Sequence, residues 1–225
     1  MLVCFDAAEM QFSTLVCFAV EQEAVPFRKI VPRSAGVQVL VTGMGRRNAG
    51  MAIAKSLEDF APELVLTCGF AGGLNPALGS GTVIFSAKTN DALAQRLASK
   101  KIRAGRFHEL DRVATTAAEK QALFEQTGAD AVEMESGCIS AICAAKGFPC
   151  AIVRVILDSA EEDLPLDFNQ LMNRNQEMDY WRLALALARS PGNVGRLLRL
   201  QKQSKLAAEN LAQALIGFLE QDAVP

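Results

Sequence analysis

Acidic side chains follow several apolar runs of this sequence, where their types and positions could support acid–base chemistry. Glu133 and Glu135 flank a methionine in "DAVEMESG", Asp158 follows the apolar run "AIVRVIL", and Glu23 comes soon after "TLVCFAV". An ionised carboxylate accepts strong hydrogen bonds from hydroxyl groups, and a carboxyl group with a raised pKa can donate a proton to a reacting molecule. These acids are far apart along the chain, so the fold must bring them together.

Five short runs rich in β-branched residues are predicted to be strands, and they cover residues 14–20, 37–43, 63–69, 81–87 and 150–157. Between them, residues 48–62 have helical apolar spacing that stops near Pro62, and residues 119–128 repeat this pattern with Gly128 as the stop. The alternation indicates an α/β fold: a single domain with a twisted mixed, mostly parallel sheet flanked by helices.

Ligands of open α/β sheets bind beyond the carboxyl ends of the strands, so these ends are the candidate site. The candidate ends read "AVEQEAVPF", "TGMGRRNAG", "CGFAGGLNP", "VEMESG" and "LDSAEEDLP"; three of these five segments present a carboxylate and two present clustered glycines. In "GFAGGLNP", the glycines allow close approach to a flat ligand or form a tight turn. "GMGRRNAG" does not match the dinucleotide fingerprint and no Walker lysine follows, which disfavours NAD and ATP.

The length and composition favour one domain, spanning residues 1–225, with a helical C-terminal segment from about residue 167. The 23 basic and 25 acidic side chains give a net charge of -2 without a basic block, so nucleic acid is not an expected partner. Six cysteines form no C-x-x-C pair, which is typical of a reducing, cytoplasmic setting. His108 is the only histidine, so we expect no metal site.

The last part of the chain is predicted to be a long amphipathic helix. Packing on the sheet or on a second subunit is the favoured interpretation. Contact with a membrane surface through the cations from Arg196 to Lys205 is the less favoured alternative. No segment has the roughly 18 uninterrupted apolar residues of a membrane helix, so we expect a soluble protein.

Three segments resemble the signature regions of the nucleoside phosphorylase and nucleosidase superfamily, which includes methylthioadenosine/S-adenosylhomocysteine nucleosidase and futalosine hydrolase. They read "TGMGRRNAGMAIAKSLEDFAPELVLTCGFAGGLNPALGSGTVIFS", "TGADAVEMES" and "VRVILDSA". The similarity runs in order from about residue 14 to 160, and "LPLDF" with the C-terminal tail is similar to the hopanoid-associated branch. The resemblance implies a nucleoside phosphorylase-like fold that cleaves the N-glycosidic bond of a purine nucleoside, with adenine as the expected base and no metal or organic cofactor.

The resemblance also implies a role for each acid. Glu135 would hold the 2',3'-diol of the ribose, with Met134 against the sugar face, and would stabilise the oxocarbenium-like ribose. Asp158 would protonate N7 of the departing purine. Glu23 would position and deprotonate water, with Glu21 as the alternative register. Further substrate contacts are expected from Glu133, Phe70, Ala71, Gly72 and Val113.

Structural interpretations of the same acids stay open at this point. Glu133 and Glu135 could form a solvated helix start or a cap, and Asp158 could be an ordinary turn residue. The family usually has serine before this aspartate, whereas this chain has Leu157; Ser159 could supply the missing hydrogen bond.

The nucleophile is predicted from the loop after the third strand. Phosphorylases of the superfamily hold phosphate there with arginines and a serine, whereas Phe70 stands at the serine position here and no arginine lies just upstream. A dianion binds poorly without those donors, so hydrolysis is favoured. Phosphorolysis is the alternative, with Gly45 and Arg46 as candidate phosphate ligands.

Two further expectations rest on the resemblance. The segment between residues 87 and 106 is shorter than in nucleosidases of small substrates, which favours a nucleoside with a bulky or lipidic 5' group. Members of the family indicate a homodimer or a higher homo-oligomer. Because of Leu157, Phe70 and the amphipathic tail, a second alternative is an inactive nucleoside-binding or membrane-scaffold protein.

Overall fold

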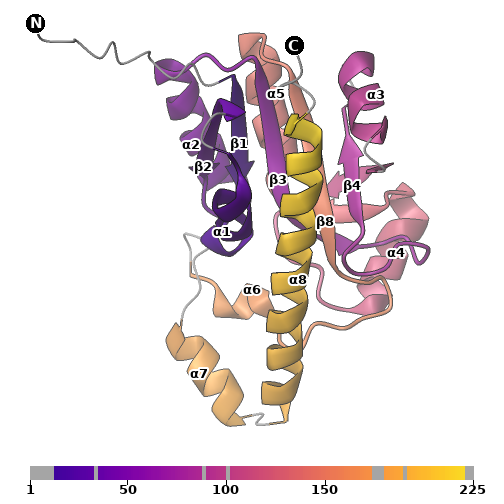
Figure 1. Ribbon diagram of the computed structural model, residues 1–225. Helices are drawn as coiled ribbons and strands as arrows, with labels where there is room; N and C mark the ends of the chain where they lie inside the picture. Colours follow the sequence, from indigo (N-terminus) through magenta and orange to yellow (C-terminus); the bar gives the residue numbers. More distant parts are fainter. Residues whose placement is uncertain are drawn as a thin grey trace, which may run out of the picture.

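The computed structural model describes residues 13–32, 35–87, 90–99, 102–173, 180–189 and 192–220. It confirms the predicted fold class, a single α/β domain with a mixed, mostly parallel sheet and helices on both faces (Figure 1). The first twelve residues, with Cys4, lie outside the described part of the chain.

The sheet has eight strands, and five of them lie at the predicted apolar runs. The strands are β1 (Thr14–Phe18), β2 (Val37–Val41), β3 (Leu64–Gly73), β4 (Val83–Ser86), β5 (Arg103–Ala104), β6 (Phe107–Glu109), β7 (Ala131–Glu133) and β8 (Cys150–Asp158). The main order is β2-β1-β3-β8-β4-β5, and β7 pairs with both β3 and β6. The strands β2, β1, β3 and β8 are parallel neighbours, whereas β4 runs antiparallel to β8.

The strand β3 is longer than predicted. It continues past Gly69, the last residue of the predicted run, through Gly72 and Gly73, because β8 pairs with it as far as Gly72 and β7 pairs with Gly72 and Gly73. The glycine cluster is therefore extended backbone in the sheet and not a tight turn.

The helices are α1 (Glu21–Ile30), α2 (Gly45–Asp59), α3 (Asp91–Ser99), α4 (Ala117–Thr127), α5 (Ser136–Lys146), α6 (Phe168–Leu171), α7 (Tyr180–Arg189) and α8 (Asn193–Leu219). The helix predicted at residues 48–62 begins earlier, at Gly45, and ends at Asp59. The predicted stop of α4 is confirmed: Gly128 has a left-handed φ of 60°, and its amide donates to the carbonyl of Phe124.

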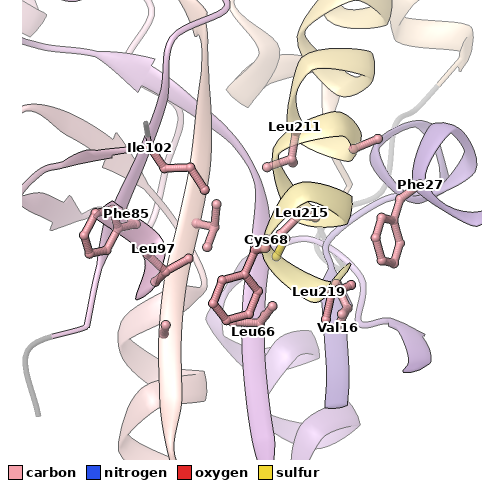
Figure 2. Close-up of a cluster of buried hydrophobic side chains, with 14 of the residues drawn as sticks. Val16, Phe27, Leu66, Cys68, Phe85, Leu97, Ile102, Leu211, Leu215 and Leu219 are labelled. Carbon is pink, nitrogen blue, oxygen red and sulfur yellow. The ribbon is translucent and has the colours of Figure 1, made fainter. Parts of the chain in front are cut away.

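Alternate side chains of β1 pack in two separate hydrophobic cores, because successive side chains of a strand point to opposite faces of the sheet. Val16 and Phe18 pack with α1, α3 and α8, whereas Leu15 and Cys17 pack with α2 and α5. Figure 2 shows the first core, in which side chains of α8 lie over the strands of the sheet. The sheet is covered on both faces, which explains why its central strands are apolar runs.

The helix α8 has two halves with different surroundings. Its C-terminal half is buried on the sheet, as predicted, through Ala207, Ala208, Leu211, Ala212, Leu215, Phe218 and Leu219. Its N-terminal half extends beyond the end of the sheet, in the same region as α6 and α7 (Figure 1). Among the described residues, no helix combines the length and apolarity needed to cross a membrane.

Candidate active site

Glu23 is a buried carboxylate in the first turn of α1, only 4% exposed. Its Oε2 accepts hydrogen bonds from the amides of Ala19 (2.9 Å) and Val20 (3.2 Å), and its Oε1 accepts one from the amide of Phe70 (2.7 Å). Burial raises the pKa of Glu23 to about 7, although the Phe70 amide and the positive charge of Arg154 oppose this shift. The carboxylate can therefore exchange a proton near neutral pH.

The structure distinguishes the two registers that the sequence left open. Glu21 is exposed and pairs with Arg28 at 2.5 Å, on the outer side of α1. Gly69, by contrast, brings the backbone of β3 close to Glu23: a Cβ added there would lie 2.7 Å from Glu23 Oε1, and φ is +148°. Glycine is required at this contact, which places Glu23 beside the C-terminal half of β3.

Glu135 is the N-cap residue of α5, but its carboxylate does not cap that helix. Its Oε1 accepts from the amide of Gly45, the first residue of α2, at 2.8 Å, and its Oε2 lies 3.8 Å from a guanidinium nitrogen of Arg154. Burial raises the pKa of Glu135, opposed by Arg154 and by the Gly45 amide. Each carboxylate oxygen accepts more than one hydrogen bond, so the group can accept further hydrogen bonds from a ligand.

Glu133 has the capping function that the sequence analysis left open for the pair. Its Oε2 accepts from the amides of Glu135 (3.0 Å) and Ser136 (2.7 Å), and its Oε1 accepts from the Ser136 hydroxyl at 2.6 Å. Arg154 pairs with the same carboxylate at 2.9 Å. Burial acts to raise the pKa of Glu133, but Arg154 and the Ser136 donors hold it below its usual value. Internal donors therefore bond both oxygens of Glu133, and its contact with substrate stays a prediction.

Asp158 ends β8 and is buried beside an unexpected partner. The ammonium of Lys120, on α4, donates to Asp158 Oδ2, to the carbonyl of Ser159 (2.9 Å) and to the carbonyl of Glu162 (2.8 Å). Lys120 is completely buried. Burial raises the pKa of Asp158, and Lys120 opposes that shift. Lys120, and not Ser159 as the sequence suggested, bonds the Asp158 carboxylate, and the Ser159 amide donates to Glu162 at 3.0 Å.

The three acids meet around the carboxyl end of β3. Gly69 and Phe70 contact Glu23, and Gly72 is the register partner of Asp158 on β8. A Cβ added at Gly72 would lie 3.7 Å from Asp158 Oδ2. Glu135 is close enough to raise the pKa of Glu23 by charge repulsion. The arrangement places three buried carboxyl groups of raised pKa around the C-terminal half of one strand.

A cavity of about 300 Å³ adjoins this strand end. Asp158 lines it, together with residues 162–165 and Arg196, Arg199, Leu200 and Gln203 of α8. Val113, predicted to contact the base, lies on the neighbouring loop, which Asn169 of α6 holds through two hydrogen bonds to the Val113 backbone, of 2.8 and 2.9 Å. Met134 and Ala71 are buried and Phe70 is half-buried, all on the elements that carry the acids.

The two candidate phosphate ligands have partners within the protein. The Gly45 amide, at the N-terminus of α2, donates to Glu135, so a carboxylate occupies the place where a helix N-terminus would hold an anion. Arg46 is 68% exposed and pairs with Glu109 at 3.1 Å. Both candidate phosphate ligands therefore already bond a carboxylate of the protein.

The chain belongs to the phosphorylase superfamily, because the model of that family matches residues 21–98 and 86–187. Among curated relatives, it is 26% identical to the aminodeoxyfutalosine nucleosidase of Campylobacter jejuni over 161 residues, which covers 57% of this chain and 70% of the relative. It is 24% identical to the 5'-methylthioadenosine/S-adenosylhomocysteine nucleosidase of Shewanella halifaxensis over 172 residues, covering 60% of this chain and 75% of the relative.

Solved structures share the fold. The 5'-methylthioadenosine/S-adenosylhomocysteine nucleosidase of Neisseria meningitidis, in complex with methylthio-immucillin-A, superposes with a TM-score of 0.70 at 18% identity, covering 93% of this chain and 99% of the other. The futalosine hydrolase of Helicobacter pylori gives a TM-score of 0.67 at 16% identity, covering 94% and 99%. The similarity to the hopanoid-associated branch stays a prediction.

Two buried cations of the site were not assigned roles from the sequence. Arg154 interrupts the apolar run "AIVRVIL", and a charge in a buried strand is itself a signal of a buried ion pair. Lys120 gives no such signal, because it stands in a predicted helix, where a lysine is normally exposed. Its burial follows only from the packing of α4 against residues 158–162.

Proposed function

We propose that this protein hydrolyses the N-glycosidic bond of a purine nucleoside, with adenine as the base and a bulky group at the 5' position. The observation that carries the proposal is Glu23, a buried carboxylate beside the carboxyl end of β3 with a pKa raised to about 7, as a base that deprotonates water near neutral pH requires. The nucleosidase relatives support hydrolysis as the reaction class.

In this proposal Glu135 binds the ribose. One of its oxygens is fixed by the Gly45 amide, and the other accepts the hydroxyl groups of the diol in short, charge-assisted hydrogen bonds. The same carboxylate stabilises the positive charge that develops on the ribose as the bond to the base breaks. Arg154 and Glu133 hold this side chain in place, since both lie next to it and are buried.

Asp158 is the proposed proton donor to the base, and Lys120 positions it. A general acid must hold its proton until the reaction, which burial of Asp158 favours. All three N–H groups of the Lys120 ammonium already have acceptors, so the ammonium itself has no proton directed at the base. After the transfer, Lys120 stabilises the Asp158 carboxylate, which lowers the free-energy cost of giving up the proton.

Water is favoured over phosphate as the nucleophile because Gly45 and Arg46 are engaged with Glu135 and Glu109. The test is to incubate the protein with 5'-methylthioadenosine, S-adenosylhomocysteine and a 5'-alkylated adenosine, with and without phosphate. We expect the same rate of adenine release in both buffers and a free pentose by mass spectrometry. A strict phosphate requirement with release of a pentose 1-phosphate would make the protein a phosphorylase, and binding without turnover would make it a non-catalytic nucleoside-binding protein.

The Arg46→Gln substitution gives an independent check of the nucleophile. Exposed ion pairs contribute about 0–1 kcal/mol to stability, so the variant should fold normally. Because hydrolysis does not use Arg46, we expect kcat/KM for the nucleoside to change less than about fivefold. Phosphate should remain without effect on this variant. A large loss of activity that high phosphate restores would identify Arg46 as a phosphate ligand and would contradict the hydrolytic assignment.

The pKa of Glu23 predicts a pH dependence that can be isolated with p-nitrophenyl riboside, whose leaving group needs no proton from Asp158. Glu23 must be ionised to take a proton from water, so kcat/KM should rise with pH and level off above about 7. Below that pH we expect about a tenfold fall per pH unit. A profile that is flat from about pH 5 to about pH 8 would show that Glu23 is not the base.

We also retain the predictions that residues 1–225 form one domain and that the protein is a homo-oligomer. Size-exclusion chromatography with light scattering tests the oligomeric state. Limited proteolysis tests the domain organisation, since a single domain should be cut only near its ends or in exposed loops.

A further inference from the structure

The exposed large apolar side chains of the described residues are concentrated on one part of the molecule. Five of the eight, Trp181, Leu185, Val194, Leu198 and Leu206, lie on α7 and on the N-terminal half of α8. Trp181 is 87% exposed and Leu198 is 60% exposed. This part of α8 extends beyond the sheet (Figure 1), so the hydrophobic core does not account for its apolar residues. Clustered exposed apolar side chains indicate an interaction surface.

The same half of α8 is strongly basic. Between residues 193 and 208 the sequence contains four cations and no acidic residue, and all four cations are exposed: Arg196, Arg199, Lys202 and Lys205. Among the described residues, none of these four side chains forms an ion pair with a carboxylate, and Arg196 donates to the backbone carbonyl of Asp163 at 3.0 Å. Positive charge beside exposed apolar groups selects a partner that is both anionic and apolar.

Apolar and cationic side chains lie on one stripe of α8. Val194, Leu198, Lys202 and Lys205 are three or four residues apart, which places them on one side of the helix. Three of them, Leu198, Lys202 and Lys205, also line a groove of about 790 Å³ between α8 and α1, where Val25, Pro26 and Ile30 form the apolar wall. The groove therefore combines an apolar wall with ammonium groups, although Glu21 and Glu209 are also among its lining residues.

We propose that α7 and residues 193–206 of α8 form a docking surface for an anionic lipid bilayer, which they contact reversibly from one side. Aromatic and aliphatic side chains would enter the interface between head groups and acyl chains, while lysine and arginine pair with anionic head groups. The other side of α8, through Arg196 and Arg199, lines the cavity at Asp158, so the docked surface would adjoin the candidate active site.

Charge argues against a second copy of the chain as the occupant. A two-fold symmetric interface places the same patch of each subunit against itself, so the cations of the two α8 helices would face each other. Like charges brought together at an interface disfavour association. An anionic lipid surface instead satisfies the cations and the exposed apolar groups together.

The test is co-sedimentation of the full-length protein with vesicles of phosphatidylcholine mixed with phosphatidylglycerol, compared with phosphatidylcholine alone. We expect binding to the anionic vesicles only. Raising the ionic strength from about 0.1 M to about 1 M shortens the screening length from about 10 Å to about 3 Å and should release most of the protein. Equal binding to both vesicle types, or no binding to either, would overturn the proposal.

Two variants and a matched control separate this surface from non-specific charge. Lys202→Gln with Lys205→Gln should weaken vesicle binding on the order of tenfold or more, and Leu198→Ser should also weaken it. Lys55→Gln with Lys146→Gln removes the same charge from exposed residues of α2 and α5, which cover the opposite face of the sheet, and should leave binding unchanged.

Circular dichroism and thermal unfolding would verify that each variant is folded. The proposal is wrong if the two double variants bind alike. It is also wrong if the wild-type protein does not bind anionic vesicles and light scattering shows that Leu198→Ser converts an oligomer into a monomer. The surface would then be a subunit interface. None of these outcomes depends on the proposed reaction, so a failure here leaves the hydrolase assignment untouched.

Discussion

Asp158→Asn is expected to lower kcat for a purine nucleoside by about 10²- to 10⁴-fold, the usual contribution of a general acid. The amide is nearly the same size as the carboxyl group but cannot supply an acidic proton to the departing base. Steady-state kinetics with 5'-methylthioadenosine would measure the loss, and binding of adenine to the variant would show that the site is still formed.

The leaving group supplies a sharper control for the role of Asp158. The p-nitrophenolate ion leaves without protonation, so Asp158→Asn should cleave p-nitrophenyl riboside at a rate within about tenfold of the wild-type protein, well short of the loss for a proton donor. A similar large loss for both substrates would mean that Asp158 organises the site and does not donate the proton. Unchanged turnover of the purine nucleoside would remove it from the mechanism altogether.

Lys120→Met is expected to lower the free energy of unfolding by about 3–5 kcal/mol, the usual cost of breaking a buried ion pair. The substitution removes the donor to Asp158 and to the carbonyls of Ser159 and Glu162, at a completely buried position. Urea unfolding monitored by circular dichroism measures the change. Lys55→Met, at an exposed position of α2, is the matched control and should change stability by less than about 0.5 kcal/mol.

The pH dependence of Lys120→Met distinguishes a positioning role from simple packing. Burial already raises the pKa of Asp158 and Lys120 opposes this, so the pKa should rise further in the variant. The folded variant then holds a proton that the unfolded chain releases, so its loss of stability should be small at acidic pH and grow as pH rises through the folded-state pKa. The alkaline limb of its activity profile should also move to higher pH. If the loss of stability is equal at all pH values and the alkaline limb of the activity profile does not move, Lys120 contributes to packing alone and does not position Asp158.

The central strands were predictable because parallel strands with both faces covered must be apolar runs. The runs of β1, β2, β4 and β8 fall where they were predicted, whereas β3 extends through Gly69 to Gly73 because neighbouring strands pair with its glycines. The strands β5, β6 and β7 have only two or three residues. Such segments are too short to show an alternating pattern, and tertiary pairing alone creates them.

The site was predictable to the extent that it lies at strand ends. Glu23 and Asp158 follow β1 and β8, which are both parallel to β3, so topology brings them to one edge of the sheet. Glu135 follows β7, which runs antiparallel to β3, and the pairing of β7 with Gly72 and Gly73 places it nearby. What could not be predicted is which backbone amides donate to which carboxylate. Glu133 caps α5 and Glu135 takes the Gly45 amide, and this division depends on the angle at which α5 and α2 approach the sheet.

The account depends on one nucleoside lying against all three acids, and a crystal structure of the protein with adenine and ribose bound tests this most directly. We expect Asp158 within about 2.6–3.2 Å of N7 of the base, with Glu135 at the same distance from the ribose diol and Glu23 facing the C1 carbon through a water molecule. Adenine bound away from Asp158, or a ribose that does not reach Glu135, would contradict the account.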